Sequence, residues 1–345
     1  ECSTRGESTV ATILDVAERA GVSASTVSRV LNGTGNVQMQ LREKVLAAVT
    51  ELGYVPSSSA RVLRGKPSNT IALIVSDVTN PFFAALARGV EDVAQQQGFS
   101  LVLCNADRGP AKQRRYLDRL VADGVKGMVV APAKNTLMDL KRRVRQGVSM
   151  VVVDWRYPLQ EADNVYTDSV DGARQLVAHL IGLGHRRIGI ISGPHGDMTA
   201  EDRVAGYRLA LAEAGLSVAP QLVRFGQFTS ESGRRNCTKL LSLNPPPTAI
   251  VTCNNRLAAG AYEALCSRGL VVPLDLSLVS FDDIPFVAAL ASSATVFVQP
   301  DYEMGHKAAE LLFERLLNQR RTHDRREVVL QGRLIVRSSA QRLQS

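Results

Sequence analysis

The sequence has no long apolar run, few aromatic residues and no cysteine pair with metal-site or redox spacing. Its apolar stretches, such as 127–133, are far shorter than the roughly 18 residues of a membrane-spanning helix. Residues 1–10 contain no apolar core of the kind found in signal peptides, so we expect a cytoplasmic protein. The five cysteines form an odd set without C-x-x-C spacing, which disfavours disulfides and a zinc site. We therefore expect no metal and no other cofactor.

Catalytic motifs are also missing from the sequence. No G-x-S-x-G, P-loop, H-E-x-x-H or G-x-G-x-x-G occurs where a strand, a turn and a helix would follow one another. We therefore expect a protein that is not an enzyme. The net charge of +8 is compatible with a polyanion as partner, but residues 1–66 contribute only eight basic against six acidic side chains. The basic runs at 141–145 and 320–326 are typical of solvated faces.

At 345 residues the chain is long enough for two or three domains, and it begins with a predicted helical hairpin. The first helix opens at Thr12 or Ile13, and Gly21 supplies the left-handed conformation that ends it. Ser23 is a good N-cap for a second helix, whose apolar residues, such as Val27, face inward. Two short helices are thus expected to meet at a tight turn.

The outward face of the second predicted helix carries small or hydrogen-bonding side chains. These are Ala24, Ser25, Thr26, Ser28, Arg29 and Asn32. Small polar residues let a helix enter the major groove of DNA, and Arg29 can donate two parallel hydrogen bonds to a guanine edge. A face that served only solubility would more typically carry Glu and Lys. The hairpin therefore predicts a helix-turn-helix DNA-binding domain over residues 11–55.

The run TILDVAERAGVSASTVSRVLNG, which starts at Thr12, resembles the headpiece of the lactose-repressor (LacI/GalR) family, and the resemblance extends over residues 11–340. It implies that Ala24, Ser25 and Arg29 contact bases. It further implies that the DNA backbone is contacted by Thr12, Ser23, Thr26, Ser28 and Asn32. A third helix is predicted over 41–54, with Val45, Leu46, Val49 and Leu52 facing the first two. Gln38 and Leu41 stand where the family usually has a capping residue, so we expect a weak cap there.

Residues 56–68 contain two prolines, Pro56 and Pro67, and are rich in Ser and Arg, a composition typical of a linker. The resemblance implies instead a hinge helix that folds only on DNA. In that interpretation Ala60 and Leu63 contact the minor groove, and Leu63 wedges between base pairs at the operator centre. Both interpretations remain open from the sequence.

From residue 70 onward, apolar strands alternate with amphipathic helices, and the pattern occurs twice. Nearly all-apolar strands separated by helices predict parallel sheets covered on both faces. We expect an α/β body over 69–340 with two lobes, like a periplasmic binding protein. The expected lobes are 69–165 with 297–325, and 166–296 with 326–340.

Ligands of open α/β sheets bind beyond the carboxyl ends of the strands, so the loops there should line a cleft between the lobes. These loops mix aromatic rings with carboxylates, amides and guanidinium groups, as a polyhydroxylated ring requires. From the loops and from the resemblance, which implies an arginine clamp at Arg203 and a cleft position for Gln299, the expected effector contacts are Asp77, Phe82, Phe83, Trp155, Arg203, Phe228, Asn254, Asp282 and Gln299. Core burial is the alternative for Phe82 and Phe83, and helix capping is the alternative for Asp282.

These observations predict a homodimeric transcription regulator that binds double-stranded operator DNA and a small-molecule effector. A repressor of a sugar uptake or catabolic operon, relieved by its sugar, is the first expectation. A purine corepressor, a sugar-binding receptor and a sugar-modifying enzyme are the alternatives, although no catalytic residue set is visible. No long leucine heptad follows residue 320, which favours a dimer over a tetramer.

Overall fold

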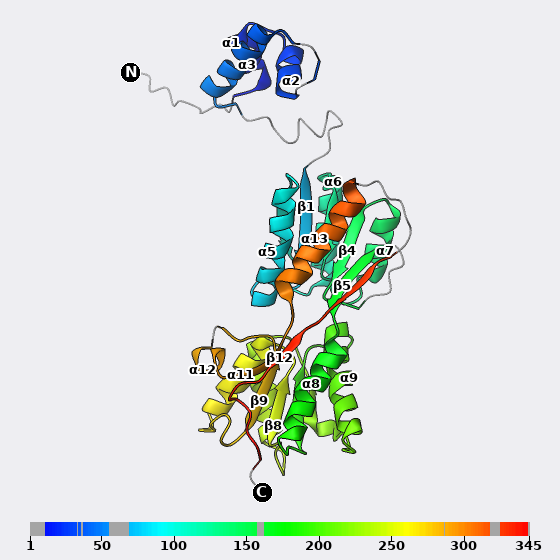
Figure 1. Ribbon diagram of the computed structural model, residues 1–345, viewed down its shortest axis with the longest axis vertical. Helices are drawn as coiled ribbons and strands as arrows, with labels where there is room; N and C mark the ends of the chain where they lie inside the picture. Colours follow the sequence, from blue (N-terminus) through cyan, green and yellow to red (C-terminus); the bar gives the residue numbers. More distant parts are fainter. Residues whose placement is uncertain are drawn as a thin grey trace, which may run out of the picture. The chain divides into compact units, whose positions relative to one another are not determined.

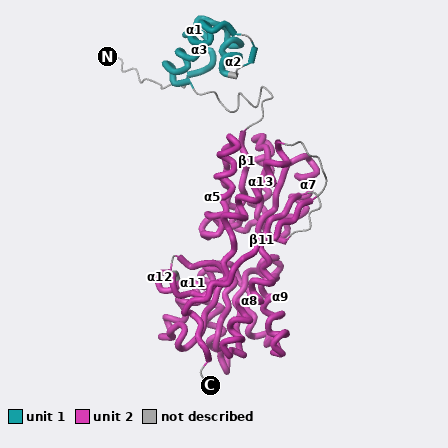
Figure 2. Tube along the Cα trace, in the orientation of Figure 1, with its two compact units in different colours: residues 1–68 teal, residues 69–345 magenta. Residues whose placement is uncertain are grey.

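The computed structural model describes residues 11–32, 34–35, 37–54, 69–156, 162–285, 287–317 and 325–343. It divides into two compact units, residues 1–68 and 69–345 (Figure 2). The predicted hinge at 56–68, with Ala60 and Leu63, lies outside the described residues. Within the described part, no helix is both long and apolar enough to span a membrane.

Within residues 11–54, the first unit contains three helices around a small core (Figure 1). They are α1 (Ile13–Ala20), α2 (Ala24–Asn32) and α3 (Met39–Glu51). The buried core side chains are Val16, Ala17, Val27, Val30, Val45 and Ala48. The expectation that Leu46 faces inward is wrong, because Leu46 is 45% exposed. Val45 and Ala48 occupy the inward stripe of α3, and a helix turns each successive side chain by about 100°.

Local side-chain chemistry fixes the ends of these helices. Thr12 forms a capping box at α1, in which its hydroxyl accepts from the Asp15 backbone N–H and the Asp15 carboxylate accepts from the Thr12 N–H at 2.7 Å. Gly21 ends α1 with a φ of 65°, and the Ser23 hydroxyl accepts from the Thr26 N–H at 3.3 Å. The Gln38 side chain makes no capping bond at α3, which agrees with the weak cap expected there.

The first lobe of the second unit contains a six-stranded parallel sheet. Its order is β11 (Glu327–Leu330), β5 (Asp163–Thr167), β4 (Ser149–Val153), β3 (Gly127–Val130), β1 (Thr70–Val75) and β2 (Ser100–Asn105). Alternate residues of β1 pack on opposite faces, so two separate cores form. One face is covered by α5 (Pro81–Gln96) and α13 (Asp301–Leu317), and the other by α6 (Pro110–Ala122) and α7 (Leu137–Arg145).

The second lobe contains another six-stranded sheet, in which only β12 is antiparallel to its neighbour. Its order is β12 (Arg333–Ile335), β10 (Thr295–Val298), β9 (Ser277–Phe281), β8 (Ala249–Thr252), β6 (Ile188–Ser192) and β7 (Val223–Phe225). The helix α8 (Ser169–Gly182) packs against α9 (Met198–Glu213), and α10 (Ser230–Leu241) packs against α11 (Asn255–Cys266) (Figure 1). The short helices are η1 (Pro220–Leu222) and α12 (Ala288–Ala291).

The chain crosses between the lobes three times: after β5, after β10 and after β11. Two crossings lie a few residues later than expected, because β10 completes the second sheet and β11 still belongs to the first. Strand β5 was not expected from the apolar pattern, since Asp163 and Asn164 interrupt it. Both side chains are buried, and Asn164 Nδ2 donates to the Val152 carbonyl at 3.1 Å. Specific polar partners therefore stabilise this strand in addition to Val165, which packs into the core of the first lobe.

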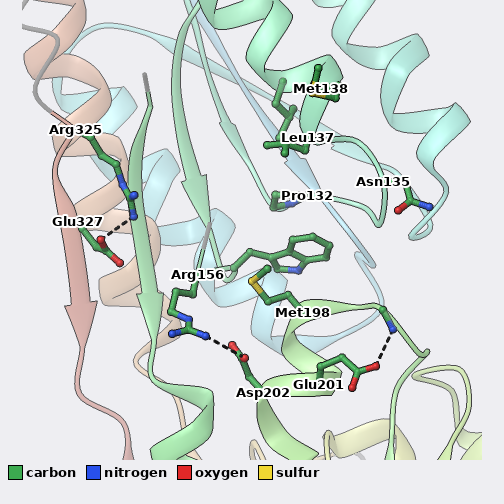
Figure 3. A pocket seen from close by; sticks show the side chains of 13 residues that line it. Pro132, Asn135, Leu137, Met138, Arg156, Met198, Glu201, Asp202, Arg325 and Glu327 are labelled. Carbon is green, nitrogen blue, oxygen red and sulfur yellow. Dashed lines mark hydrogen bonds and ion pairs between the residues drawn. The ribbon is translucent and has the colours of Figure 1, made fainter. Parts of the chain in front are cut away.

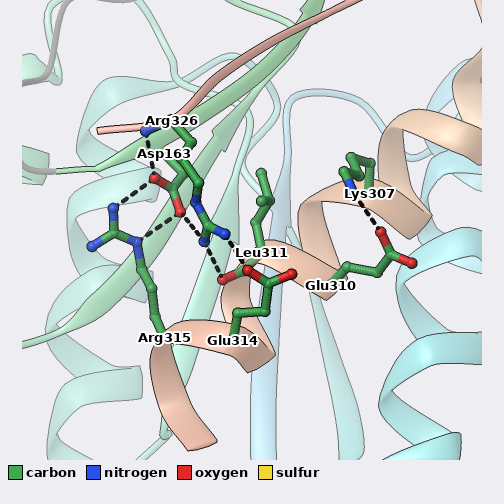
Figure 4. Close-up of polar contacts among 7 residues, drawn as sticks. All are labelled: Asp163, Lys307, Glu310, Leu311, Glu314, Arg315 and Arg326. Carbon is green, nitrogen blue, oxygen red and sulfur yellow. Dashed lines mark hydrogen bonds and ion pairs between the residues drawn. The ribbon is translucent and has the colours of Figure 1, made fainter. Parts of the chain in front are cut away.

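A buried carboxylate joins β5, α13 and the start of β11 (Figure 4). Asp163 accepts hydrogen bonds from Arg315 Nη2 at 2.6 Å and from Arg326 Nη2 at 2.8 Å, and also from the Arg326 backbone N–H at 2.9 Å. Burial on its own would raise the pKa of Asp163, but the two guanidinium groups hold that pKa below its usual range. The cluster therefore fixes the returning strand against the first lobe.

Candidate functional sites: a recognition helix and an interlobe cleft

The exposed face of α2 carries the predicted DNA-contacting side chains. Thr12, Ser23, Ser25 and Arg29 are exposed, whereas Thr26 and Ser28 are half-buried. Three hydroxyl groups meet at the start of the helix, where Ser23 Oγ lies 2.8 Å from Ser25 Oγ and 2.9 Å from Thr26 Oγ1. Such a cluster of donors at a helix N-terminus suits a phosphate group.

Two members of the predicted DNA-contacting set stand apart from this group. Ala24 is half-buried and packs against the headpiece core, so only part of it faces outward. The side chain of Asn32 lies outside the described part of the structure. Arg29 is thus the long exposed side chain of the set, in the position from which a guanine edge could be reached.

A small cavity of about 20 Å³ lies between the two lobes of the body. It is lined by Asn80, Phe82, Phe83, Arg108, Asp154, Thr199, Arg203, Phe228, Asn254, Asp282 and Gln299. Seven of these lining residues were predicted as effector contacts from the sequence. Among the others, Arg108 and Thr199 give no sequence signal of their own, because neither directly follows an apolar strand. The cavity has room for about one water molecule.

Several polar atoms of this cavity have no hydrogen-bond partner among the described residues. Arg203 on α9 is buried with its guanidinium 4.0 Å from the Phe281 ring centre, and its Nη1 donates to the Cys253 carbonyl. Arg203 Nε, Thr199 Oγ1 and Asn254 Nδ2 are buried and unsatisfied. A buried polar group without a partner costs about 1–3 kcal/mol, so three of them in one cavity favour a polar ligand there.

Two carboxylates occupy matching positions in the two lobes. Asp154 directly follows β4 and Asp282 directly follows β9, and both have left-handed backbones, with φ of 67° and 62°. Burial raises the pKa of Asp154 to about 6, although Arg203 and Arg108 act in the opposite direction. Burial also raises the pKa of Asp282, whose carboxylate accepts a hydrogen bond from Gln299 Nε2 at 3.0 Å. The pair can accept hydrogen bonds from ligand hydroxyl groups on two sides.

Aromatic rings form the apolar walls of the cavity. Phe82 and Phe83 meet edge to face, 5.0 Å between ring centres, at the start of α5. Both also belong to the core of the first lobe, so each of these two residues is at once buried in the core and part of the cavity lining. Phe228 faces them from the second lobe, and the Arg108 guanidinium lies 4.4 Å from its ring centre.

The structure places Asp77 and Trp155 outside the lining of this cavity, against the prediction. The Asp77 carboxylate accepts from the Thr79 N–H at 3.0 Å and lies 3.8 Å from Arg256 Nη1 of the other lobe. Trp155 is buried and, like Met198, lines a neighbouring hollow of about 970 Å³. Figure 3 shows Met198 and other side chains that line this hollow. The left-handed backbone at Asp154 turns the chain, so the Asp154 side chain lines the small cavity and Trp155 lines the hollow.

Polar contacts hold the two lobes together around the cavity. Asn255 Nδ2 donates to Asn80 Oδ1 at 3.1 Å, and Lys134 Nζ donates to the His195 carbonyl at 2.6 Å. Figure 3 shows a further pair, in which Arg156 Nη2 lies 3.6 Å from Asp202 Oδ1. Each contact joins one lobe to the other, so the lobes are closed. Among the described residues, no cluster of His, Cys, Asp or Glu is placed to hold a metal ion.

Comparison with known proteins gives two matching family models. Residues 12–57 match the lacI family of bacterial regulatory proteins, and residues 177–340 match a periplasmic binding protein-like domain. The ribose operon repressor of Haemophilus influenzae is 34% identical over 331 residues, which cover 96% of this chain and 98% of the relative. The chain belongs to the lacI family. It is therefore a DNA-binding transcription regulator with a ligand-binding body, and not an enzyme.

Two solved structures of relatives extend over nearly the whole chain. A lac repressor dimer bound to operator and to the anti-inducer ONPF superimposes with a TM-score of 0.81 at 28% identity, covering 96% of this chain and all of that one. A complex of the transcriptional regulator CelR with cellobiose superimposes with a TM-score of 0.72 at 32% identity, covering 95% and 99%. The predicted fold, a helical headpiece followed by a two-lobed α/β body, is confirmed.

Proposed function

We propose that this lacI-family member is a cytoplasmic repressor of a sugar uptake or catabolic operon that releases its operator when a sugar occupies the interlobe cavity. The observation that carries the proposal is the composition of that cavity. Two carboxylates, two arginines, three amides and a hydroxyl converge between phenylalanine rings, and three of the polar atoms lack partners among the described residues. Sugars offer many hydroxyl groups, which match the polar side chains of the lining, and flat C–H faces, which match the phenylalanine rings.

The α2 face supports the DNA half of the proposal. Arg29 and Ser25 project from an exposed helix surface, and the hydroxyls of Ser23 and Thr26 lie beside them. We assign Arg29, Ser25 and Ala24 to base contacts and the hydroxyl groups to phosphates. The lac repressor relative was solved with operator as a dimer, which supports the same assembly here.

A homodimer is further supported by an uncovered edge of the first lobe. The edge strand β2 pairs only with β1, and Val102 and Leu103 on it are exposed. Exposed apolar residues on an edge strand are a liability unless another surface covers them. A second copy of the chain would cover them, and two headpieces would then bind two half-sites of a near-palindromic operator.

The small volume of the cavity indicates how a sugar would control operator affinity. A volume of about 20 Å³ excludes a monosaccharide, so entry requires the lobes to separate and Arg108 to leave the Phe228 ring. The contacts of Asn255 and Lys134 with the opposite lobe would break or re-form in that step. A change in lobe spacing would alter the separation of the two headpieces in a dimer, with a coupling of about 1–3 kcal/mol.

A purine corepressor is the second candidate effector, favoured by the three phenylalanine rings and by the raised pKa of Asp154. A carboxyl group that is partly protonated near neutral pH can donate to a ring nitrogen as well as accept. In that case ligand would strengthen operator binding.

A thermal-shift screen of the full chain against pentoses, hexoses, their phosphates and purines tests the proposal, because a ligand of the folded state raises the melting temperature. We expect a sugar to bind wild type and Arg208→Gln, an exposed control on α9, and to fail with Arg203→Gln. Fluorescence anisotropy with a selected operator duplex then gives the sign of regulation. A shift only with purines, or stronger operator binding with ligand, would contradict the sugar-inducer proposal.

A further inference from the structure

The positive charge of this protein is not in its DNA-binding headpiece. Residues 11–54 contain four basic and four acidic side chains, so the described headpiece is neutral. Residues 107–147 contain eleven basic and four acidic side chains, a net charge of +7 out of the +8 of the whole chain. The strongest charged region of the chain is therefore in the body, in a stretch that the cavity uses only through Arg108.

The fold gathers this stretch into one surface. Leu117 of α6 and Leu140 of α7 pack on the same face of the first sheet, so the polar sides of both helices face away from it. Arg114 Nη1 lies 3.2 Å from Asp139 Oδ2, and Arg143 pairs with Asp118, so the two helices are neighbours. We call this surface the α6–α7 face. Its basic residues are Arg114, Arg115, Arg119, Lys126, Lys141, Arg142, Arg143 and Arg145.

The acidic residues of the α6–α7 face neutralise only a part of this charge. Even with Lys141 and Arg145 left out of the count, the three carboxylates Asp118, Asp123 and Asp139 face six basic side chains, an excess of three positive charges. Arg119 pairs with Asp123 but remains 78% exposed, and Arg142 remains 56% exposed at 3.7 Å from Asp139. Exposed pairs of this kind are weak and are easily replaced by a polyanion.

The α6–α7 face reaches the edge of the lobe at which the described body begins. The Lys126 backbone N–H donates to the carbonyl of Thr70, the first residue of β1, at 2.9 Å. Gly127, the next residue, is in register with Ser149 at the start of β4, which follows α7 after three residues. Both basic helices thus end near the amino-terminal ends of the sheet strands. The chain leads from that end of β1, through residues 55–68, to the headpiece.

We propose that the α6–α7 face binds the phosphate backbone of DNA beside the operator and supplies much of the salt-dependent affinity of this protein. The inference rests on the proposed operator binding by the headpiece. Cationic contacts with phosphates release counterions, whereas the neutral hydroxyl donors of α2 release few. DNA is favoured over an acidic protein because a headpiece bound to its operator holds DNA at high local concentration near the same chain.

The test uses the full chain and a 60-base-pair duplex of random sequence, about the length of several non-specific sites. The face variant is Arg119→Gln, Lys126→Gln and Arg142→Gln combined. The control variant is Arg208→Gln, Arg235→Gln and Lys239→Gln, which removes three exposed charges from the second lobe. Equal melting temperatures of the two variants show that any difference comes from binding and not from folding.

Affinity is measured between about 50 and 200 mM salt. We expect the slope of log K against log salt to fall by about 1 for each lost phosphate contact in the face variant, and to stay at its wild-type value in the control. At the lowest salt the face variant should bind roughly tenfold more weakly. Equal slopes for the face variant and the control would overturn the proposal and leave the face to another partner.

A separate measurement distinguishes a failure of the α6–α7 proposal from a failure of the proposed operator binding. Wild type is used to select duplexes from a random-sequence library. If no sequence is enriched, operator recognition fails, while the salt slope on the random duplex still decides the role of the α6–α7 face. If an operator is enriched, the face variant should retain its sequence preference, because phosphate contacts carry little sequence information.

Discussion

The headpiece and the body place their functional residues in opposite environments. In the headpiece, six small side chains form the core, and the predicted DNA contacts lie on an exposed helix. In the body, seven of the predicted effector contacts line a cavity between two lobes, and Arg203 and Asp282 are buried there. A local sequence pattern is therefore enough to find the first site, whereas the second forms only when two six-stranded sheets bring distant loops together.

The largest expected effect concerns the core of the body. Asp163→Asn removes one charge from a buried cluster and leaves Arg315 and Arg326 without their common partner, so the free energy of unfolding should fall by about 3 kcal/mol. Urea unfolding monitored by the fluorescence of Trp155, the single tryptophan, measures this. Asp123→Asn, at an exposed pair with Arg119, is the control and should cost less than about 1 kcal/mol.

The same cluster has a defined pH dependence. The folded pKa of Asp163 is below its ordinary value of 3.8, so its stabilising contribution is complete above that value and is lost as pH falls through the folded pKa. An Asp163→Asn variant that matched wild type at neutral pH would contradict this account.

Asp154 in the cavity should show the opposite sign. Its pKa is raised from 3.8 to about 6 by burial, so the folded body binds more protons than the unfolded chain between these values. Stability should therefore fall by up to about 3 kcal/mol as pH rises from below 3.8 to above 6. Asp154→Asn should remove this loss, and the difference in melting temperature between variant and wild type should grow over that range. A constant difference would show that Asp154 keeps an ordinary pKa.

A medium effect is expected in the headpiece core. Val27→Ala removes two methyl groups from a fully buried position and should cost about 2 kcal/mol. In so small a core this should abolish DNA binding at moderate temperature while effector binding by the body is unchanged. Leu14→Ala, at an exposed position of α1, is the matched control. If Val27→Ala also lost effector binding, the two units would not fold independently.

The smallest expected effect concerns the start of α1. Thr12→Ala removes the capping box with Asp15 and should cost about 1 kcal/mol, whereas Thr12→Ser should keep most of the cap. The measurement is circular dichroism melting of the full chain. The transition that Val27→Ala lowers is assigned to the headpiece, and the other transition is assigned to the body. No change for Thr12→Ala would mean that the Thr12 contribution lies in DNA binding alone.

The headpiece was largely predictable because its determinants are local. Thr12, Gly21 and Ser23 fix the ends of two helices through contacts within four residues. The errors in the headpiece arose where packing decides. Leu46 is apolar but faces outward, and Ala24 is partly covered by the core.

In the body, the sequence predicted the strands that are apolar and the loops that follow them, and seven of the predicted contacts line the cavity. It did not predict β5, because buried Asp163 and Asn164 are stabilised by partners far away in the chain. It also could not show that the neighbours Asp154 and Trp155 line different spaces. The left-handed backbone at Asp154 places one side chain at the cavity and the other at the hollow.

The helix-turn-helix, the alternation of strands and helices, and the family can be read from the amino-acid sequence, because these depend on spacing and on short-range contacts. Which loops share a cavity depends on tertiary packing, since Arg108 and Phe228 are far apart in sequence and meet across two lobes. Tertiary packing also decided that basic residues of α6 and α7 form one surface, because two helices packed on one sheet face add their charges. Long-range packing, and not composition, therefore decides which of these residues lie close to one another.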